Sequence, residues 1–69
     1  QNTPLKVVFD EIRKYYNVTI EVEDASIEEL RLTTNFSDQT AGEVLEVIAL
    51  SFNLRVEKNG TKYRISFNE

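Results

Sequence analysis

The chain contains no cysteine, histidine, methionine or tryptophan, and only two glycines and one proline. Without cysteine no disulfide framework can stabilise it, and without cysteine and histidine the usual zinc ligand sets are excluded. No apolar run approaches the ~20 residues of a membrane span, and no signal-peptide pattern is present. With 69 residues, 41% of them hydrophobic, the sequence predicts one small domain over residues 1–69 with a core of aliphatic and aromatic side chains.

Positive charge is also scarce, because 8 basic residues stand against 12 acidic ones and the formal net charge is −4. This balance argues against a nucleic-acid partner, which needs clustered Lys and Arg, and against an anionic membrane surface. Because the chain opens on Gln1 and has no Met, we interpret it as a segment of a longer protein. Targeting signals and membrane spans would then lie upstream.

What the sequence does contain is an internal echo, in which Pro4–Glu21 and Thr40–Glu57 align at a spacing of 36 residues. Val8 matches Val44, Ile12 matches Ile48 and Asn17 matches Asn53. Self-similarity at a fixed period predicts one supersecondary unit per copy. Each unit reads as an amphipathic helix that runs through an Asn into a strand.

In the first unit, Thr3 is expected to cap a helix that has Pro4 at its first position. An apolar stripe with helical spacing follows, formed by Leu5, Val8, Phe9, Ile12 and Tyr16. Asn17 tolerates the left-handed conformation of a C-terminal cap. Alternation over residues 18–23 then predicts a half-buried strand with Glu21 and Glu23 on its outer face.

The second unit is preceded by a connector, Asp24–Leu30, in which Ser26 and Glu29 suggest a capping box and a single helical turn. Residues 31–36 alternate and predict a second strand, and residues 37–39 a turn. A second capping box, Thr40 with Glu43, begins the second helix. Its apolar face is wider than that of the first helix, so we expect it to be the more buried of the two.

The segment after Asn53 predicts a β-hairpin around the dipeptide Asn59-Gly60, which favours a two-residue type I′ loop. The pairing expected from that loop joins Lys58 to Thr61, Glu57 to Lys62, Val56 to Tyr63 and Leu54 to Ile65. Arg55 would then lie opposite Arg64 on the outer face, where like charges destabilise a sheet. We therefore expect the strand that carries Glu21 and Glu23 to neighbour the hairpin and offset the arginines.

These elements predict an α+β fold with a doubled helix–strand unit and the order (β)-α-β-β-α-β-β, the bracketed strand lying just before Gln1. Two helices would pack on one side of a mixed or antiparallel sheet, or between two small sheets. A nucleotide-binding α/β domain is excluded, because the Gly-rich phosphate turn is absent.

No motif for catalysis, cofactor binding or metal binding is present, so the sequence predicts a protein without enzymatic activity. The serines have no His to activate them, and the adjacent Asp10 and Glu11 diverge on a helix. Acidic Glu28-Glu29 lacks the spacing of a Ca²⁺ loop. A strand edge, which can add a partner's strand, is the remaining recognition device, and the sequence leaves open which edge is free.

Three residues are candidate partner-binding residues: Tyr15, Arg55 and Arg64. Tyr15 lies off the main helical stripe, so we expect it to be partly exposed. The other two tyrosines, Tyr16 and Tyr63, fall on predicted core faces.

The chain resembles the C-terminal domain of FecR-type proteins, membrane-anchored anti-sigma regulators, in the form abundant in Bacteroidetes. The resemblance covers nearly the whole chain and is carried by Asn2-Thr3-Pro4-Leu5, by Tyr15-Tyr16-Asn17-Val18 leading into Ile20-Glu21, by Leu32–Phe36 with Ser37-Asp38, by Glu43–Ile48, and by the hairpin ending Tyr63-Arg64-Ile65. The signalling domain at the N-terminus of secretins and TonB-dependent transducers has a similar doubled helix–strand unit. Resemblance to that domain is the alternative interpretation.

The resemblance implies a periplasmic domain of an inner-membrane protein that does not itself span the membrane. Such a regulator holds an extracytoplasmic-function sigma factor through its cytoplasmic part and senses a ligand-occupied TonB-dependent outer-membrane transducer. Its partner would be the transducer's signalling domain, met through a strand edge. The alternative is that the chain is itself the N-terminal signalling domain of a TonB-dependent receptor or secretin. The family brings no catalytic residues to this sequence.

Overall fold

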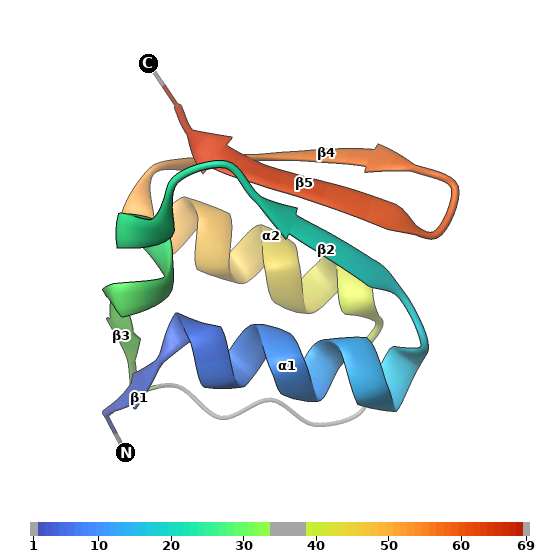
Figure 1. Ribbon diagram of the computed structural model, residues 1–69, viewed down its shortest axis with the longest axis horizontal. Helices are drawn as coiled ribbons and strands as arrows, with labels where there is room; N and C mark the ends of the chain where they lie inside the picture. Colours follow the sequence, from blue (N-terminus) through green and yellow to red (C-terminus); the bar gives the residue numbers. More distant parts are fainter. Residues whose placement is uncertain (1, 34–38, 69) are drawn as a thin grey trace.

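The computed structural model describes residues 2–33 and 39–68. Its elements, in chain order, are β1 (Thr3–Pro4), α1 (Leu5–Tyr16), β2 (Thr19–Val22), the 3₁₀ turn η1 (Ala25–Glu29), β3 (Arg31–Leu32), α2 (Ala41–Phe52), β4 (Leu54–Asn59) and β5 (Lys62–Phe67). The two helices cover one face of a three-stranded sheet, while β1 and β3 form a small second sheet at one end (Figure 1). The α+β class is confirmed.

The repeat is expressed in the backbone. Both helices have 12 residues and begin at equivalent positions of the two copies, Leu5 and Ala41. Each ends at an asparagine in the left-handed conformation, Asn17 with φ 55° and Asn53 with φ 57°. The predicted asparagine caps are therefore confirmed, and a strand follows each one.

The two helices begin differently. At α2, the Glu43 N–H donates to the Thr40 hydroxyl (3.1 Å) and the Thr40 N–H to the Glu43 carboxylate (2.9 Å), which confirms the second capping box. At α1 the expected Thr3 cap is wrong, because Thr3–Pro4 is the strand β1 and Pro4 is the cap residue without a side-chain bond. The Leu5 N–H instead donates to the Leu30 carbonyl at 2.8 Å. A distant backbone acceptor replaces the side-chain cap, and the strand β1 directly precedes the helix.

The connector contains one helical turn, as predicted, but Asp24 caps it rather than Ser26. The Ser26 N–H (3.0 Å) and hydroxyl (2.8 Å) both donate to the Asp24 carboxylate. The capping box of Ser26 with Glu29 is wrong because Ser26 already lies inside the turn. Strand β3 covers only two residues. Thr33 is described and lies outside the strand, so the predicted strand is too long there. The rest of the predicted strand and most of the predicted turn fall at 34–38, outside the described residues.

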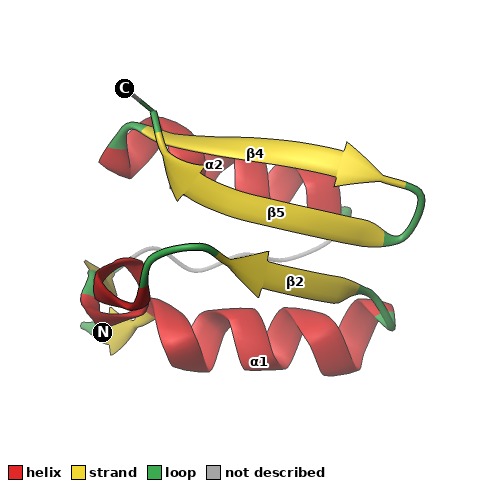
Figure 2. Cartoon of the chain, turned by 45° about the horizontal axis from the view of Figure 1, so that its top comes forward, coloured by secondary structure: helices red, strands yellow, loops and turns green. Residues whose placement is uncertain are grey.

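The three-stranded sheet has the order β2-β5-β4, with β5 at its centre, parallel to β2 and antiparallel to β4. Figure 2 shows β2 on the side of α1 and β4 on the side of α2, with β5 between them. Glu21 lies beside Arg64 across the parallel pair. The prediction that the first strand neighbours the hairpin is therefore confirmed.

The hairpin register differs by two residues from the one expected. Asn59 pairs with Lys62, so the loop residues are Gly60 and Thr61, and the Arg55 partner is Ser66 rather than Arg64. Gly60 has φ +66°, whereas Asn59 and Thr61 have negative φ. A positive φ at the first loop residue only is the pattern of a type II′ turn, which needs Gly there and no second left-handed residue. The like-charge pair therefore does not form, and Glu57 faces Arg64.

The core lies between the sheet and the two helices. Its fully buried members include Leu5 and Phe9 of α1, Leu45 and Ile48 of α2, Ile27 of η1 and Ile65 of β5. Helix α2 has four buried side chains and α1 has three, which agrees with the prediction that the second helix is the more buried. Tyr63 is buried, and the half-buried Tyr16 donates its hydroxyl proton to the Gln39 carbonyl.

Candidate interaction surface

The sheet face that points away from the helices is covered by charged side chains. Strand alternation turns Ile20, Tyr63 and Ile65 toward the core, so their neighbours along each strand face solvent. We call this surface the charged sheet face; its six charged residues are Glu21 and Glu23 from the β2 side, Arg55 and Glu57 from β4, and Lys62 and Arg64 from β5.

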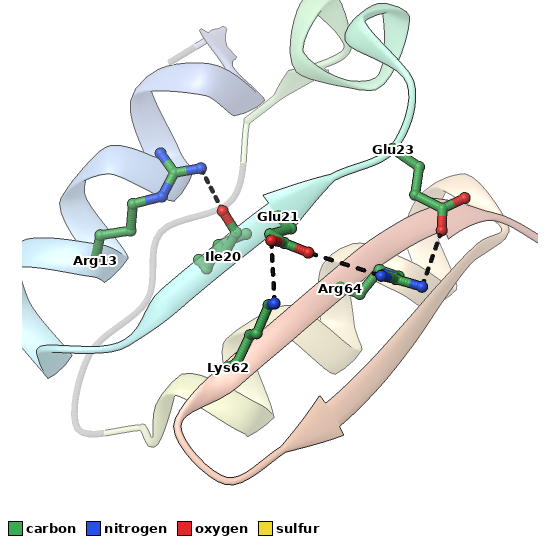
Figure 3. Close-up of polar contacts among 6 residues, drawn as sticks. All are labelled: Arg13, Ile20, Glu21, Glu23, Lys62 and Arg64. Atoms are coloured by element: carbon green, nitrogen blue, oxygen red, sulfur yellow. Dashed lines mark hydrogen bonds and ion pairs between the residues drawn. The ribbon is translucent and has the colours of Figure 1, made fainter.

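Ion pairs link these residues across the strands. The Glu21 carboxylate lies 3.1 Å from the Lys62 amine and 3.9 Å from the Arg64 guanidinium, which also lies 3.5 Å from Glu23 (Figure 3). Arg55 and Glu57 pair along β4 at 3.2 Å. The paired side chains are between 47% and 62% exposed, so each pair contributes about 0–1 kcal/mol. Three positive and three negative charges balance, so the face lacks the excess of cations that phosphate groups require.

An open pocket of 540 Å³ lies at the end of this face near Glu23 and Phe67. It is lined by Glu23, Asp24, Arg55, Glu57, Arg64, Ser66 and Phe67. The pKa of Asp24 lies below its ordinary value of 3.8, chiefly because the Ser26 backbone N–H donates to the carboxylate and secondly because the Ser26 hydroxyl does so too. No set of three His, Cys, Asp or Glu residues within residues 2–33 and 39–68 is grouped closely enough to hold a metal. The pocket thus suits polar or charged side chains of another molecule.

The outer edge of β2 is blocked. The Thr19 N–H donates to the Thr61 carbonyl just before β5, and the Glu23 N–H donates to the Ile65 carbonyl of β5. Alternation therefore turns the backbone groups of Ile20 and Val22 outward. The Arg13 guanidinium of α1 donates to the Ile20 carbonyl at 2.8 Å and also pairs with Asp10 (Figure 3). A charged side chain that occupies an edge carbonyl discourages pairing with another strand.

The outer edge of β4 is open. The Asn68 N–H donates to the Asn53 carbonyl, and the paired residues Arg55, Glu57 and Asn59 direct their backbone groups to β5 in the same way. The backbone groups of Leu54, Val56 and Lys58 therefore point outward, and within the described part of the chain no hydrogen bond reaches them. Figure 2 shows no described helix or strand beyond β4 in the plane of the sheet.

The structure brings two of the three candidate partner-binding residues together. Arg55 and Arg64 both lie on the charged sheet face and line its pocket. Tyr15 belongs to the helical layer on the opposite side of the sheet, where it is 82% exposed and contacts Tyr16 edge-to-face. Lys62 and Glu57 also belong to the charged sheet face. Their expected pairing with each other is wrong, because Glu57 faces Arg64 in the observed register and the Lys62 amine pairs with Glu21 instead.

Comparison with known proteins places the chain beside one family. The family model described as FecR, C-terminal, matches residues 1–65. No curated protein matches the chain. Among the described residues, neither helix combines the length and the apolar character needed to cross a bilayer.

Proposed function

The chain belongs to the FecR C-terminal family, and we propose that it is a non-enzymatic protein-interaction domain of a FecR-like anti-sigma regulator. In this proposal the domain lies in the periplasm as part of a longer, membrane-anchored protein. It contacts the signalling domain of a ligand-occupied TonB-dependent transducer. The contact is relayed across the inner membrane to an extracytoplasmic-function sigma factor held by the cytoplasmic part of the regulator.

The observation that carries this proposal is the charged sheet face with Arg55 and Arg64 at its pocket. Its ion pairs are exposed and charge-balanced, and the pocket ends at Phe67, which is 41% exposed. Exchangeable charged groups around an accessible aromatic ring suit recognition of another protein, where charges set specificity and aromatic residues contribute area. No acidic or basic side chain is buried in the described residues, so none of these groups has the desolvated setting typical of catalysis.

A binding assay with the cognate transducer's signalling domain tests the proposal. Arg64→Gln keeps a polar side chain but removes the positive charge and its pairs with Glu21 and Glu23, and we expect the dissociation constant to rise about tenfold. Lys14→Gln is the matched control, since Lys14 is an exposed cation on α1 away from this face. Circular dichroism confirms that both variants fold. Equal affinity of wild type and Arg64→Gln would remove the charged sheet face as the contact surface.

The same binding assay distinguishes a regulator domain from the alternative, a receptor-side signalling domain. A regulator domain binds the transducer's signalling domain, whereas a receptor-side signalling domain binds the periplasmic part of a regulator. Capture of the regulator in place of the transducer domain would therefore reverse the assignment.

A further inference from the structure

We propose that two copies of this chain associate through the open β4 edge, joining two three-stranded sheets into one continuous six-stranded sheet. The inference goes beyond the proposed function, because it needs no transducer, membrane or sigma factor. A failure of one therefore leaves the other standing. Three features of β4 support this association: the direction of its backbone groups, its register and the order of its charges.

The backbone direction sets which residues pair. Leu54, Val56 and Lys58 point their N–H and carbonyl groups to the open edge, so these residues must form the hydrogen-bonded pairs with any added strand. Antiparallel pairing centred on Val56 satisfies all three positions at once. Val56 then faces its own copy, and Leu54 faces Lys58 of the second copy. This arrangement has a two-fold axis through Val56, as a closed dimer of identical chains requires.

The charge order fits that register. With Val56 on the two-fold axis, Arg55 of each copy lies opposite Glu57 of the other, and these are the closely spaced, non-hydrogen-bonded pairs of the ladder. Both side chains are accessible, at 62% and 51% exposure. Each copy already pairs Arg55 with Glu57 at 3.2 Å, so association creates an alternating network of four charges. A parallel arrangement in register would instead place each charge beside its own copy.

The β2 edge offers no equivalent site. Arg13 occupies the Ile20 carbonyl there, and β2 has only four residues against six in β4. Exposed edges are normally blunted by proline, charge or a covering element. In β4 the edge charges alternate in sign about a central valine, so they discourage a foreign strand of unmatched charge and favour a second copy.

Sedimentation equilibrium with charge-reversed variants tests the dimer. We expect the mass of the wild-type chain to rise toward that of a dimer as its concentration is increased about a hundredfold. Arg55→Glu or Glu57→Arg alone should raise the dissociation constant of the dimer about tenfold or more, since two attractive pairs become repulsive. An equimolar mixture of the two variants restores opposite charges at both pairs. It should therefore associate at least as well as the wild type.

Lys6→Glu is the control for Arg55→Glu, because it makes the same change in net charge at an exposed position of α1 and should leave association unchanged. Recovery in the mixture also shows that both variants fold. A wild-type chain that stays monomeric over the whole range, or a mixture no more associated than its components, overturns the proposal.

Amide hydrogen exchange on the wild type identifies the edge independently. Protection of the Val56 and Lys58 amides should rise with protein concentration, while the Val22 amide on the β2 edge should not respond. Concentration-dependent protection at Val22 in place of Val56 would reject the β4 register. Protection of the β4 amides that appears only with a transducer domain present would assign the edge to that partner instead.

Discussion

Replacing Arg13 with alanine should lower the free energy of unfolding by about 1.5–2.5 kcal/mol. The guanidinium donates to the Ile20 carbonyl at 2.8 Å, and hydrogen bonds to charged groups contribute ~1.5–3 kcal/mol when buried. The Arg13 side chain is 31% exposed and water can replace it at the edge, so the low end of that range applies. Its pair with Asp10, which is 50% exposed, adds about 0–1 kcal/mol. A domain of this size has a total stability of ~3–10 kcal/mol, so the loss is readily measured.

Urea unfolding followed by circular dichroism measures this loss. Lys14→Ala is the control, because Lys14 is the next residue on α1, is exposed and has no ion pair in the described structure. Asp10→Ala separates the two interactions of Arg13 and should cost less than half as much as Arg13→Ala. If Arg13→Ala and Lys14→Ala had the same unfolding midpoint, the Ile20 carbonyl would not depend on Arg13, and the claim that the β2 edge is blocked would fail.

Two further substitutions test local features. Gly60→Ala should lower the free energy of unfolding in urea by about 1–2 kcal/mol, because Gly60 has φ +66° and the strain comes from the backbone and not from a clash. Asn59→Ala should change it by less than about 0.5 kcal/mol, since Asn59 is a paired strand residue. Equal losses for the two substitutions would favour the Asn59-Gly60 loop instead. Asp24→Asn should melt at a lower temperature than wild type at neutral pH. Because the folded pKa of Asp24 lies below 3.8, its contribution is complete above 3.8 and is lost as the pH falls through the folded value; a melting-temperature difference that persists unchanged in strong acid contradicts this.

Local rules predicted those parts of the fold that depend on neighbouring residues. The helix periodicity, the two asparagine caps and the Thr40–Glu43 capping box all involve contacts within a few positions of the chain. The predicted Thr3 cap was wrong because Thr3 pairs with Leu32 of β3, which lies far along the sequence. Nothing in the local pattern shows that the Leu30 carbonyl reaches the first turn of α1.

The hairpin illustrates a different limit. A shift of two residues keeps every side chain on its original face, so the alternation of apolar and polar residues cannot distinguish the two registers. Only the turn chemistry separates them, and Asn59-Gly60 and Gly60-Thr61 both contain a suitable glycine. The neighbouring of Glu21 and Arg64 was nevertheless predictable, because the outer faces of two strands carried opposite charges. Arg13 was not, since its acceptor is a backbone carbonyl without a sequence signature.

The central place of β5 also orders the assembly of the domain in time. The two helix–strand units, residues 5–22 and 41–59, are complete before β5 is synthesised, yet β2 and β4 both pair with β5 and not with each other. Until residues 62–67 leave the ribosome, both strands lack their hydrogen-bonding neighbour, and Tyr63 and Ile65 are missing from the core. The two copies of the helix–strand unit therefore do not fold in two independent steps. Because β5 joins both units, we expect the doubled unit to fold in a single cooperative event once residues 62–67 are available.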